Sequence, residues 1–186
     1  MQPHFALLAS YNRWMNARLY AAAGTLPAAE VARDRGAFFG SILGTLNHLV
    51  VADTIWLKRF AAHPARHAAL DPVRALPMPA ALDDMACADF AALSARRAML
   101  DEVIVDWIGA LDEAALHQVL EYANTRGMRF RRELPALLLH FFNHQAHHRG
   151  QTTTLLSQAG VDVGVTDLLA LIPAAGTDAA AAPHPH

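Results

Sequence analysis

Apolar residues recur every three or four positions over most of this chain, which is the spacing of amphipathic helices. Residues 4–22 follow this spacing and end before Gly24. Residues 28–36 are polar and predict a connection between helices. Residues 38–60 are apolar around most of a helical circumference, which is typical of a helix inside a bundle. The first third of the chain therefore predicts two long helices.

A long segment rich in proline follows. Residues 63–79 contain Pro64, Pro72, Pro77 and Pro79, so they cannot form one continuous helix. We expect a long loop here, and loops of this length often cover a functional site. Helical spacing then returns from about residue 83 to residue 111 and predicts a third helix, whose N-cap is either Asp83 or Asp89.

The spacing changes again before the last long helix. Residues 117–122 and 128–134 are short, partly alternating runs around a turn with Gly127, which predicts a small β-hairpin. Residues 135–159 predict a fourth long helix that begins at a proline and ends before a glycine. Residues 166–172 predict one more short helix. Four long helices with one long crossover connection predict an all-α, four-helix-bundle fold.

The length of 186 residues suits one domain, which we expect to span residues 1–173. Residues 174–186, with the sequence AAGTDAAAAPHPH, are of low complexity and predict a loose tail. Although 54% of the residues are hydrophobic, no apolar run approaches the roughly 18 residues of a membrane span. The start of the chain lacks the pattern of a secretory signal, and one cysteine, Cys87, excludes an internal disulfide. We therefore expect a cytoplasmic protein that does not insert into membranes.

The charge pattern gives no sign of nucleic-acid binding. The formal net charge is −2, and the basic residues gather only at residues 126–132. Proteins that bind nucleic acids usually present a broader basic face.

Histidines are the residues in this sequence that most clearly suggest chemistry, and the chain has 11 of them. His144 and His148 lie one helical turn apart, a spacing at which two imidazoles can bind one metal ion. His48 lies in the middle of an apolar helix, where a buried imidazole needs a partner. Three neutral imidazoles with one open position are typical of catalytic metal sites. The alternative from spacing alone is a polar stripe of hydrogen-bonded histidines.

Four segments resemble a known family. They are HHRGQ at 147–151, HLVVADTIWLKRF at 48–60, YNRWMNARLY at 11–20 and FFGSILGTLNH at 38–48. Together they resemble the DinB/YfiT-like family, and its DinB branch in particular, over about residues 5–172. The resemblance implies a four-helix bundle, often dimeric, that holds a divalent metal ion with three histidines.

By motif position, the metal ligands that the resemblance implies are His48, His144 and His148. The same comparison leaves His140 and His147 outside the ligand set. Three imidazoles accept several metals, so zinc or nickel is favoured and iron stays open. The expected cofactor is thus one divalent transition metal ion, and the expected assembly is a homodimer.

Characterised members of this family are thiol-dependent enzymes, including bacillithiol S-transferases, mycothiol-dependent maleylpyruvate isomerase and a domain of ergothioneine-synthesis enzymes. The resemblance implies a metal-dependent S-transferase that joins a low-molecular-weight thiol to a small electrophile. The alternatives are a metal-dependent hydrolase and a non-enzymatic metal-binding protein. Gln151 and Asp53 are candidates for orienting a ligand or a bound molecule near the metal. Cys87 is interpreted as a small packing residue rather than a nucleophile.

Overall fold

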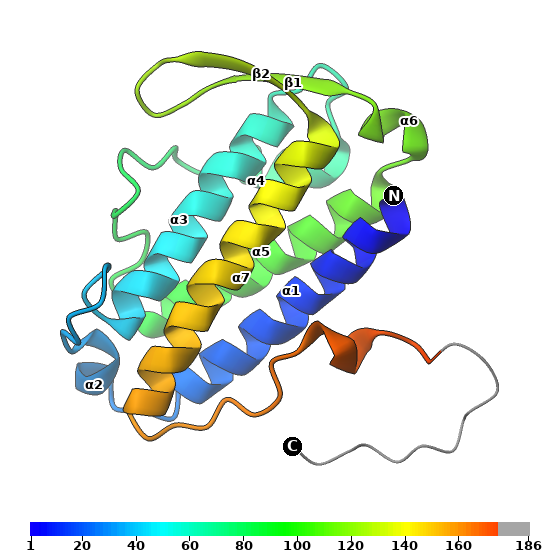
Figure 1. The fold of residues 1–186 in the computed structure, drawn as a ribbon. Coiled ribbons are helices and arrows are strands. Elements are labelled where there is room, and N and C mark those ends of the chain that lie inside the picture. The colour runs from blue at the N-terminus through cyan, green and yellow to red at the C-terminus, as the bar shows by residue number, and fades with distance from the viewer. Residues whose placement is uncertain (175–186) are drawn as a thin grey trace.

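The computed structural model describes residues 1–174, so residues 175–186 of the expected tail lie outside the described part of the chain. Four long helices form a bundle, which confirms the predicted all-α class (Figure 1). Their bounds are Gln2–Ala23 for α1, Ile42–Ala61 for α3, Phe90–Ala110 for α5 and Leu134–Gln158 for α7.

Each long helix packs against two others. Helix α1 contacts α5 and α7, and α3 contacts the same two helices from the opposite corner. The ends of α3 and α5 lie together, since the rings of Phe60 and Trp107 are 4.8 Å apart, so these two helices run parallel. Trp56 of α3 instead meets His140 near the start of α7, so α3 and α7 run antiparallel. Parallel neighbours need a crossover, and residues 62–89 provide it along the bundle, as predicted.

The core lies between the four helices and is mostly aliphatic. Leu19, Leu46, Leu57, Leu100 and Leu138 are fully buried in it. Phe60, Trp107 and Phe141 add aromatic packing. Burying one such large side chain stabilises a fold by roughly 1.5–3 kcal/mol, so this core suffices to hold α3 and α7 rigidly side by side.

Helix α3 begins later than predicted. Gly40 adopts a φ of +73°, and the Ser41 side chain then accepts a hydrogen bond of 3.0 Å from the Gly44 N–H. This cap starts the helix at residue 42, so the prediction of a helix from residue 38 was wrong. Phe38 and Phe39 consequently lie in a turn beside the helix.

Two connections contain more structure than the sequence suggested. The segment 28–36 was predicted as a connection but contains a short helix, α2 (Ala28–Ala32), because Val31 is buried against the bundle. The segment 63–79 is not one helix, as predicted, but it contains the turns η1 (Ala68–Leu70) and α4 (Asp71–Arg74). Helix α5 begins after Asp89, which caps it, and not near Asp83.

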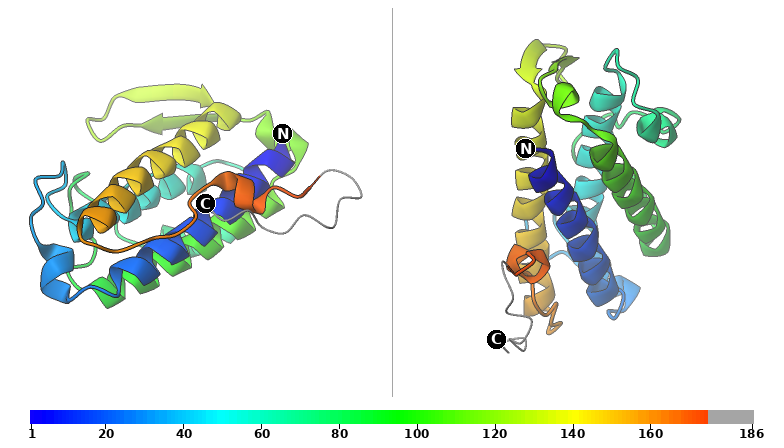
Figure 2. Two further views of the ribbon diagram at one scale, coloured as in Figure 1. Left: turned by 60° about the horizontal axis from the view of Figure 1, so that its bottom comes forward. Right: turned by 90° about the vertical axis from the view of Figure 1, so that its right-hand side faces the viewer.

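The predicted hairpin is present and lies across the end of the bundle where α3 ends and α7 begins (Figures 1 and 2). Strands β1 (Val119–Ala123) and β2 (Arg129–Glu133) pair antiparallel, with Tyr122 opposite Phe130. A short helix, α6 (Glu113–Leu116), precedes the hairpin, and the predicted helix at 166–172 is the 3₁₀ helix η2 (Leu168–Leu171). Among residues 1–174, no helix is both long and apolar enough to cross a bilayer.

Candidate metal centre

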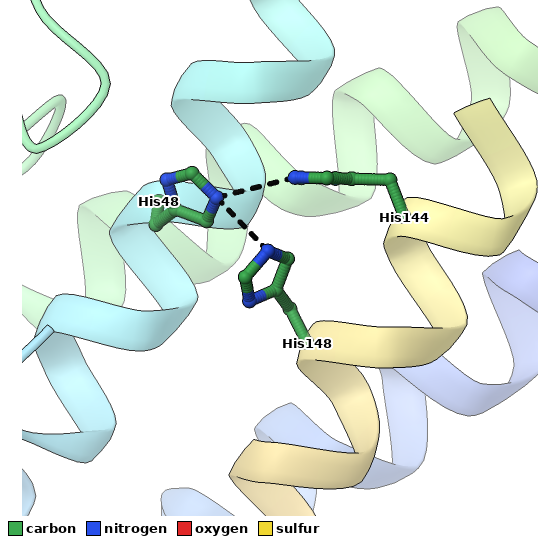
Figure 3. Close-up of side chains that lie close together, drawn as sticks. All are labelled: His48, His144 and His148. Carbon is green, nitrogen blue, oxygen red and sulfur yellow. Dashed lines mark hydrogen bonds between the residues drawn. The ribbon is translucent and has the colours of Figure 1, made fainter. Parts of the chain in front are cut away.

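The three predicted histidines come together between α3 and α7. His48 projects from α3, and His144 and His148 project from successive turns of α7 (Figure 3). The Nε2 atom of His48 lies 3.3 Å from Nε2 of His144 and 3.2 Å from Nε2 of His148. The three side chains can offer ligand atoms that all lie within 4.8 Å of one another.

Neighbouring oxygen atoms determine the tautomers of two of these rings. His48 Nδ1 lies 2.8 Å from the carbonyl oxygen of Leu82, and a carbonyl only accepts, so His48 Nδ1 carries the proton. His148 Nδ1 lies 2.8 Å from Gln151 Oε1 and donates to it in the same way. In their neutral forms, His48 and His148 therefore turn unprotonated Nε2 atoms toward the centre of the cluster.

These Nε2 atoms cannot satisfy one another. His144 can adopt the tautomer with a proton on Nε2 and donate that proton to His48. The contact between His48 and His148 would still join two acceptors at 3.2 Å, and facing lone pairs repel. Hydrogen bonding within the neutral cluster therefore leaves one contact unsatisfied, whereas a cation in the centre satisfies all three nitrogen atoms.

A positive charge in the cluster could also come from protonation of one of the imidazole rings, but the environment makes protonation unfavourable. Burial is the main factor that lowers the pKa of all three histidines. For His144, burial and the neighbouring His148 and His48 lower the pKa to about 3. The rings are therefore neutral near pH 7, which is the state in which imidazole binds a metal ion.

The geometry fits a divalent metal ion. Two nitrogen ligands at about 2.0–2.1 Å from one tetrahedral ion lie about 3.3 Å apart, and the two Nε2 separations measured from His48 are 3.3 and 3.2 Å. Hydrogen bonds from the second ring nitrogen to an oxygen, as in His48 and His148, are the usual support of metal-binding histidines.

Phe39 is a residue of this site that the sequence analysis missed. Its ring stacks on His48, with centroids 3.9 Å apart and planes 16° apart, and its edge approaches His148 at 5.6 Å. The turn before α3 places it there, and residue 39 had been assigned to the helix itself. The only signal in the sequence was the Gly40–Ser41 pair, which could have indicated a turn and cap after Phe39.

Of the neighbouring polar residues on α7, Gln151 contacts the cluster, whereas His140 and His147 lie outside the converging group. Gln151 contacts His148 directly and also approaches His147 Nε2 at 3.4 Å. His140 is exposed and makes an edge-to-face contact with Trp56, with ring centroids 5.1 Å apart, and its ring centroid lies 6.2 Å from that of His144. His140 and His147 do not belong to the group of side chains that converge.

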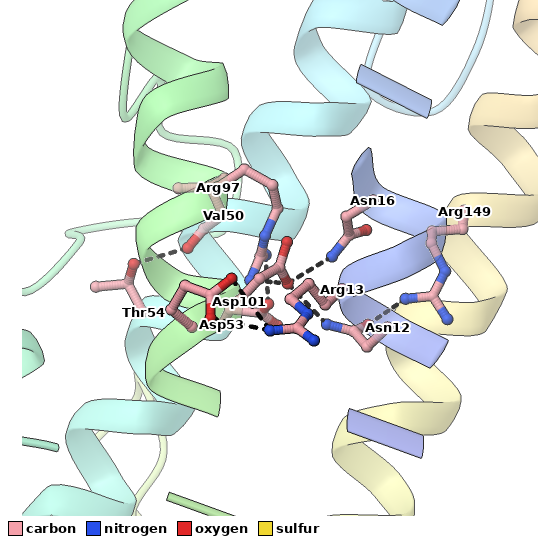
Figure 4. Close-up of polar contacts among 10 residues, drawn as sticks. Asn12, Arg13, Asn16, Val50, Asp53, Thr54, Arg97, Asp101 and Arg149 are labelled. Carbon is pink, nitrogen blue, oxygen red and sulfur yellow. Dashed lines mark hydrogen bonds and ion pairs between the residues drawn. The ribbon is translucent and has the colours of Figure 1, made fainter. Parts of the chain in front are cut away.

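Asp53 does not reach the cluster, which corrects its status as a candidate for orienting a ligand there. It is buried on another face of α3 and accepts a 2.5 Å hydrogen bond from Arg97, which also lies 3.0 Å from Asp101 (Figure 4). We call this the buried ion-pair network; its members are Asn12, Asn16, Asp53, Arg97, Asp101 and Arg149. Burial raises the pKa of Asp53, and the charge of Arg97 opposes that rise.

Cys87 is half-buried near the start of α5, where its backbone N–H donates to Asn47 Oδ1 at 3.0 Å. Its position is compatible with a packing role.

Comparison with known proteins gives one match. The model of the DinB family matches residues 1–180 of the chain. No curated protein and no solved structure matches the chain at a significant level.

Proposed function

The chain belongs to the DinB family, and from this premise we propose that it is a metal-dependent S-transferase. In this proposal His48, His144 and His148 hold one divalent ion, with zinc or nickel favoured. The substrates are a low-molecular-weight thiol and a small electrophile. The observation that carries the metal site is the convergence of Nε2 atoms whose hydrogen-bonding capacity the cluster cannot satisfy.

Three imidazoles leave room for a further ligand, which is typical of catalytic rather than structural sites. A divalent ion bound there would lower the pKa of a coordinating thiol enough to make it a thiolate at neutral pH. Leu82 and Gln151 hold two of the imidazoles in the required tautomer, and Phe39 covers one side of His48 and limits the access of water.

In the transfer itself, the sulfur forms a bond to the electrophilic carbon while the leaving group departs with the electron pair of its own bond. The proton of the thiol passes to solvent. This reaction needs no protein carboxylate, because a thiol ionises far more readily than water.

The absence of a nearby carboxylate favours thiol transfer over hydrolysis. Among the described residues, the group of possible metal ligands that converges here consists of His48, His144 and His148 and contains no Asp or Glu. Metal-assisted hydrolysis commonly uses a carboxylate as a general base, as in the metalloprotease motif in which a glutamate accompanies two histidines. A hydrolase is therefore the second candidate, and a non-enzymatic metal protein is the third.

A direct test loads the purified protein with Zn²⁺ or Ni²⁺ and measures conjugation of several small thiols to 1-chloro-2,4-dinitrobenzene by its absorbance change. We expect a rate that saturates with thiol and that disappears in the His48→Ala variant. Thiol-independent hydrolysis of an ester panel, with no conjugation, would contradict the proposal and support the hydrolase. Full metal loading with no turnover in either assay would support the non-enzymatic protein.

A further inference from the structure

A cavity lies near the end of α3, away from the histidine cluster. It has a volume of about 440 Å³ and lies between α3, residues 78–80 and strand β1. Its walls combine apolar side chains with polar and charged ones; the apolar part includes Ile55, Ala62, Met78 and Pro79, and the polar part includes Lys58, Arg59, Glu121, Asn124 and Thr125. A cavity of this size and character is suited to a small organic molecule.

Arg59 is the unusual residue of this cavity. Its guanidinium lies over the ring of Trp56 at 4.7 Å and near that of Tyr122 at 5.2 Å. It makes no hydrogen bond or ion pair with any described residue, although it is only partly exposed. Burial lowers its pKa, and no carboxylate opposes that shift. The cavity thus contains a partly desolvated positive charge without a counter-charge.

The other charged groups along the cavity are already engaged. Lys58 Nζ donates to the carbonyl oxygens of Val73, Arg74 and Leu76 at 3.3, 3.1 and 2.6 Å. Glu121 pairs with Arg131 at 3.5 Å, and both of those side chains are largely exposed. Arg59 is therefore the group in this cavity that is free to bind an anion.

We propose that Arg59 binds a carboxylate of the substrate that reacts at the histidine cluster. This inference deepens the proposed function and rests on it for the reaction, but the binding step itself requires no metal. The Arg59 guanidinium lies beside the rings of Trp56 and Tyr122, which contact each other at 5.3 Å with their planes tilted by 57°. Its N–H groups form a planar fork from which a carboxylate can accept two parallel hydrogen bonds.

A carboxylate suits the cavity better than a phosphate group does. One guanidinium balances the single charge of a carboxylate, whereas a phosphate monoester carries nearly two negative charges at pH 7. The other cation that lines the cavity, Lys58, already donates to three backbone carbonyl oxygens, so a second negative charge would be desolvated without a free cation.

The position of Arg59 relative to the cluster limits the length of the substrate. Arg59 lies three turns after His48 on the same face of α3, about 16 Å along the helix axis. His140 and Trp56 lie between them, with ring centroids 5.1 Å from each other. A molecule that reaches both sites is therefore elongated, with its reactive atom at one end and its carboxylate at the other.

The first experiment measures binding to the metal-free protein by calorimetry, with 4-phenylbutyrate and its uncharged analogue 4-phenylbutanamide as probes. We expect the acid to bind at least about tenfold more tightly than the amide, since a charge-assisted hydrogen bond contributes roughly 1.5–3 kcal/mol. Arg59→Gln should remove this preference, and Arg59→Lys should retain only part of it.

Arg126→Gln is the matched control, because it removes the same charge from the exposed tip of the hairpin. Arg59 also packs the hairpin against α3, so thermal unfolding of each variant shows whether it is folded at the temperature of the titration. Equal binding of acid and amide to the wild type, or unchanged preference in a folded Arg59→Gln protein, would overturn the proposal. Tighter binding of phenylphosphonate would overturn the choice of carboxylate.

A second experiment tests the connection between the two sites. In Co²⁺-loaded protein, a sulfur-to-metal absorption band reports thiol binding. We expect 8-mercaptooctanoate to bind at least about tenfold more tightly than 8-mercaptooctanamide, and 3-mercaptopropionate, which is too short to reach Arg59, to show no advantage over its amide. Equal binding of the long acid and amide would overturn the inference while leaving the proposed function in place. Failure of every thiol to produce the band would instead contradict the proposed function.

Discussion

The histidine cluster and the buried ion-pair network are two polar regions of one bundle, and they satisfy their polar groups in opposite ways. Helices α3 and α7 contribute to both: α3 carries His48 and Asp53, and α7 carries His148 and Arg149. In the network, two carboxylates meet two guanidinium groups and two amides (Figure 4). In the cluster, three neutral rings of one kind converge (Figure 3).

The difference between the two regions shows how to distinguish polar groups that stabilise the fold from polar groups that form a binding site for a ligand. The network contains two carboxylates and two guanidinium groups, so its charges balance within the chain. Some of its hydrogen-bonding atoms, such as Asn16 Oδ1, Arg97 Nε and Arg149 Nε, still have no partner among the described residues. The cluster has surplus acceptors and no nearby carboxylate or added donor, so its balance requires a cation. Substitutions in the two regions should therefore affect different properties.

The largest expected effect is on metal binding. His148→Ala removes one of three ligands, and we expect metal affinity to fall by more than about 100-fold, since even the loss of a supporting partner costs 10- to 100-fold. Metal content after loading and dialysis, measured by mass spectrometry, tests this. His140→Ala is the control and should keep one ion per chain; full occupancy in the His148→Ala protein would refute the ligand assignment.

The second largest expected effect is on the stability of the fold and not on metal binding. Arg97→Met leaves Asp53 and Asp101 buried without their cation, which should reduce the free energy of unfolding by about 3–5 kcal/mol. Urea unfolding measures this loss. The folded fraction of the variant should still bind metal stoichiometrically, because the histidine cluster lies on the other side of α3.

Arg13→Met is a matched comparison for Arg97→Met. Arg13 of α1 pairs with Glu102 of α5 at 3.0 Å, but both side chains are about half exposed. An exposed pair contributes about 0–1 kcal/mol. If Arg13→Met reduced the free energy of unfolding as much as Arg97→Met does, burial would not determine how much an ion pair contributes to stability in this protein.

A smaller effect is expected at Gln151. Gln151→Ala removes the acceptor that holds His148 in its tautomer, and we expect metal affinity to fall about 10- to 100-fold without loss of stoichiometry. A competition titration against a chelator measures the affinity. Gln158→Ala, an exposed glutamine at the end of the same helix, should leave the affinity unchanged, and an equal loss there would point to a general effect on α7.

The smallest effect concerns pH. The pKa of His144 is lowered to about 3 in the folded chain, below the ordinary value of 6.5. Between these values the unfolded chain binds more protons, so the metal-free protein should lose stability as pH falls through this window. His144→Asn should reduce that dependence. Urea unfolding midpoints of the wild type and of His144→Asn, recorded between pH 4 and 7, measure this dependence. If the midpoints of both proteins changed equally with pH, the lowered pKa of His144 would be contradicted.

Much of the fold and of the cluster could be predicted because the relevant signals are local. The spacing of apolar residues located the four long helices, and a one-turn spacing placed His144 and His148 on one face. Element starts were less predictable: the start of α3 depends on the left-handed backbone of Gly40 and the Ser41 cap, which apolar spacing does not report. Helical spacing places Asp53 on another face of α3 than His48, but it does not identify Arg97 of α5 as its partner.

The sequence by itself determined the four long helices, the hairpin, the family and the three converging histidines, because each depends on residues close together in the chain or on a recognisable motif. Only the tertiary structure decided the tautomers, the stacking of Phe39, the partner of Asp53 and the position of Arg59 beside Trp56 and Tyr122. Each of these depends on segments far apart in the chain, such as Leu82 against His48 and Tyr122 against Arg59. Such contacts follow from how whole helices and loops pack, which no local pattern records.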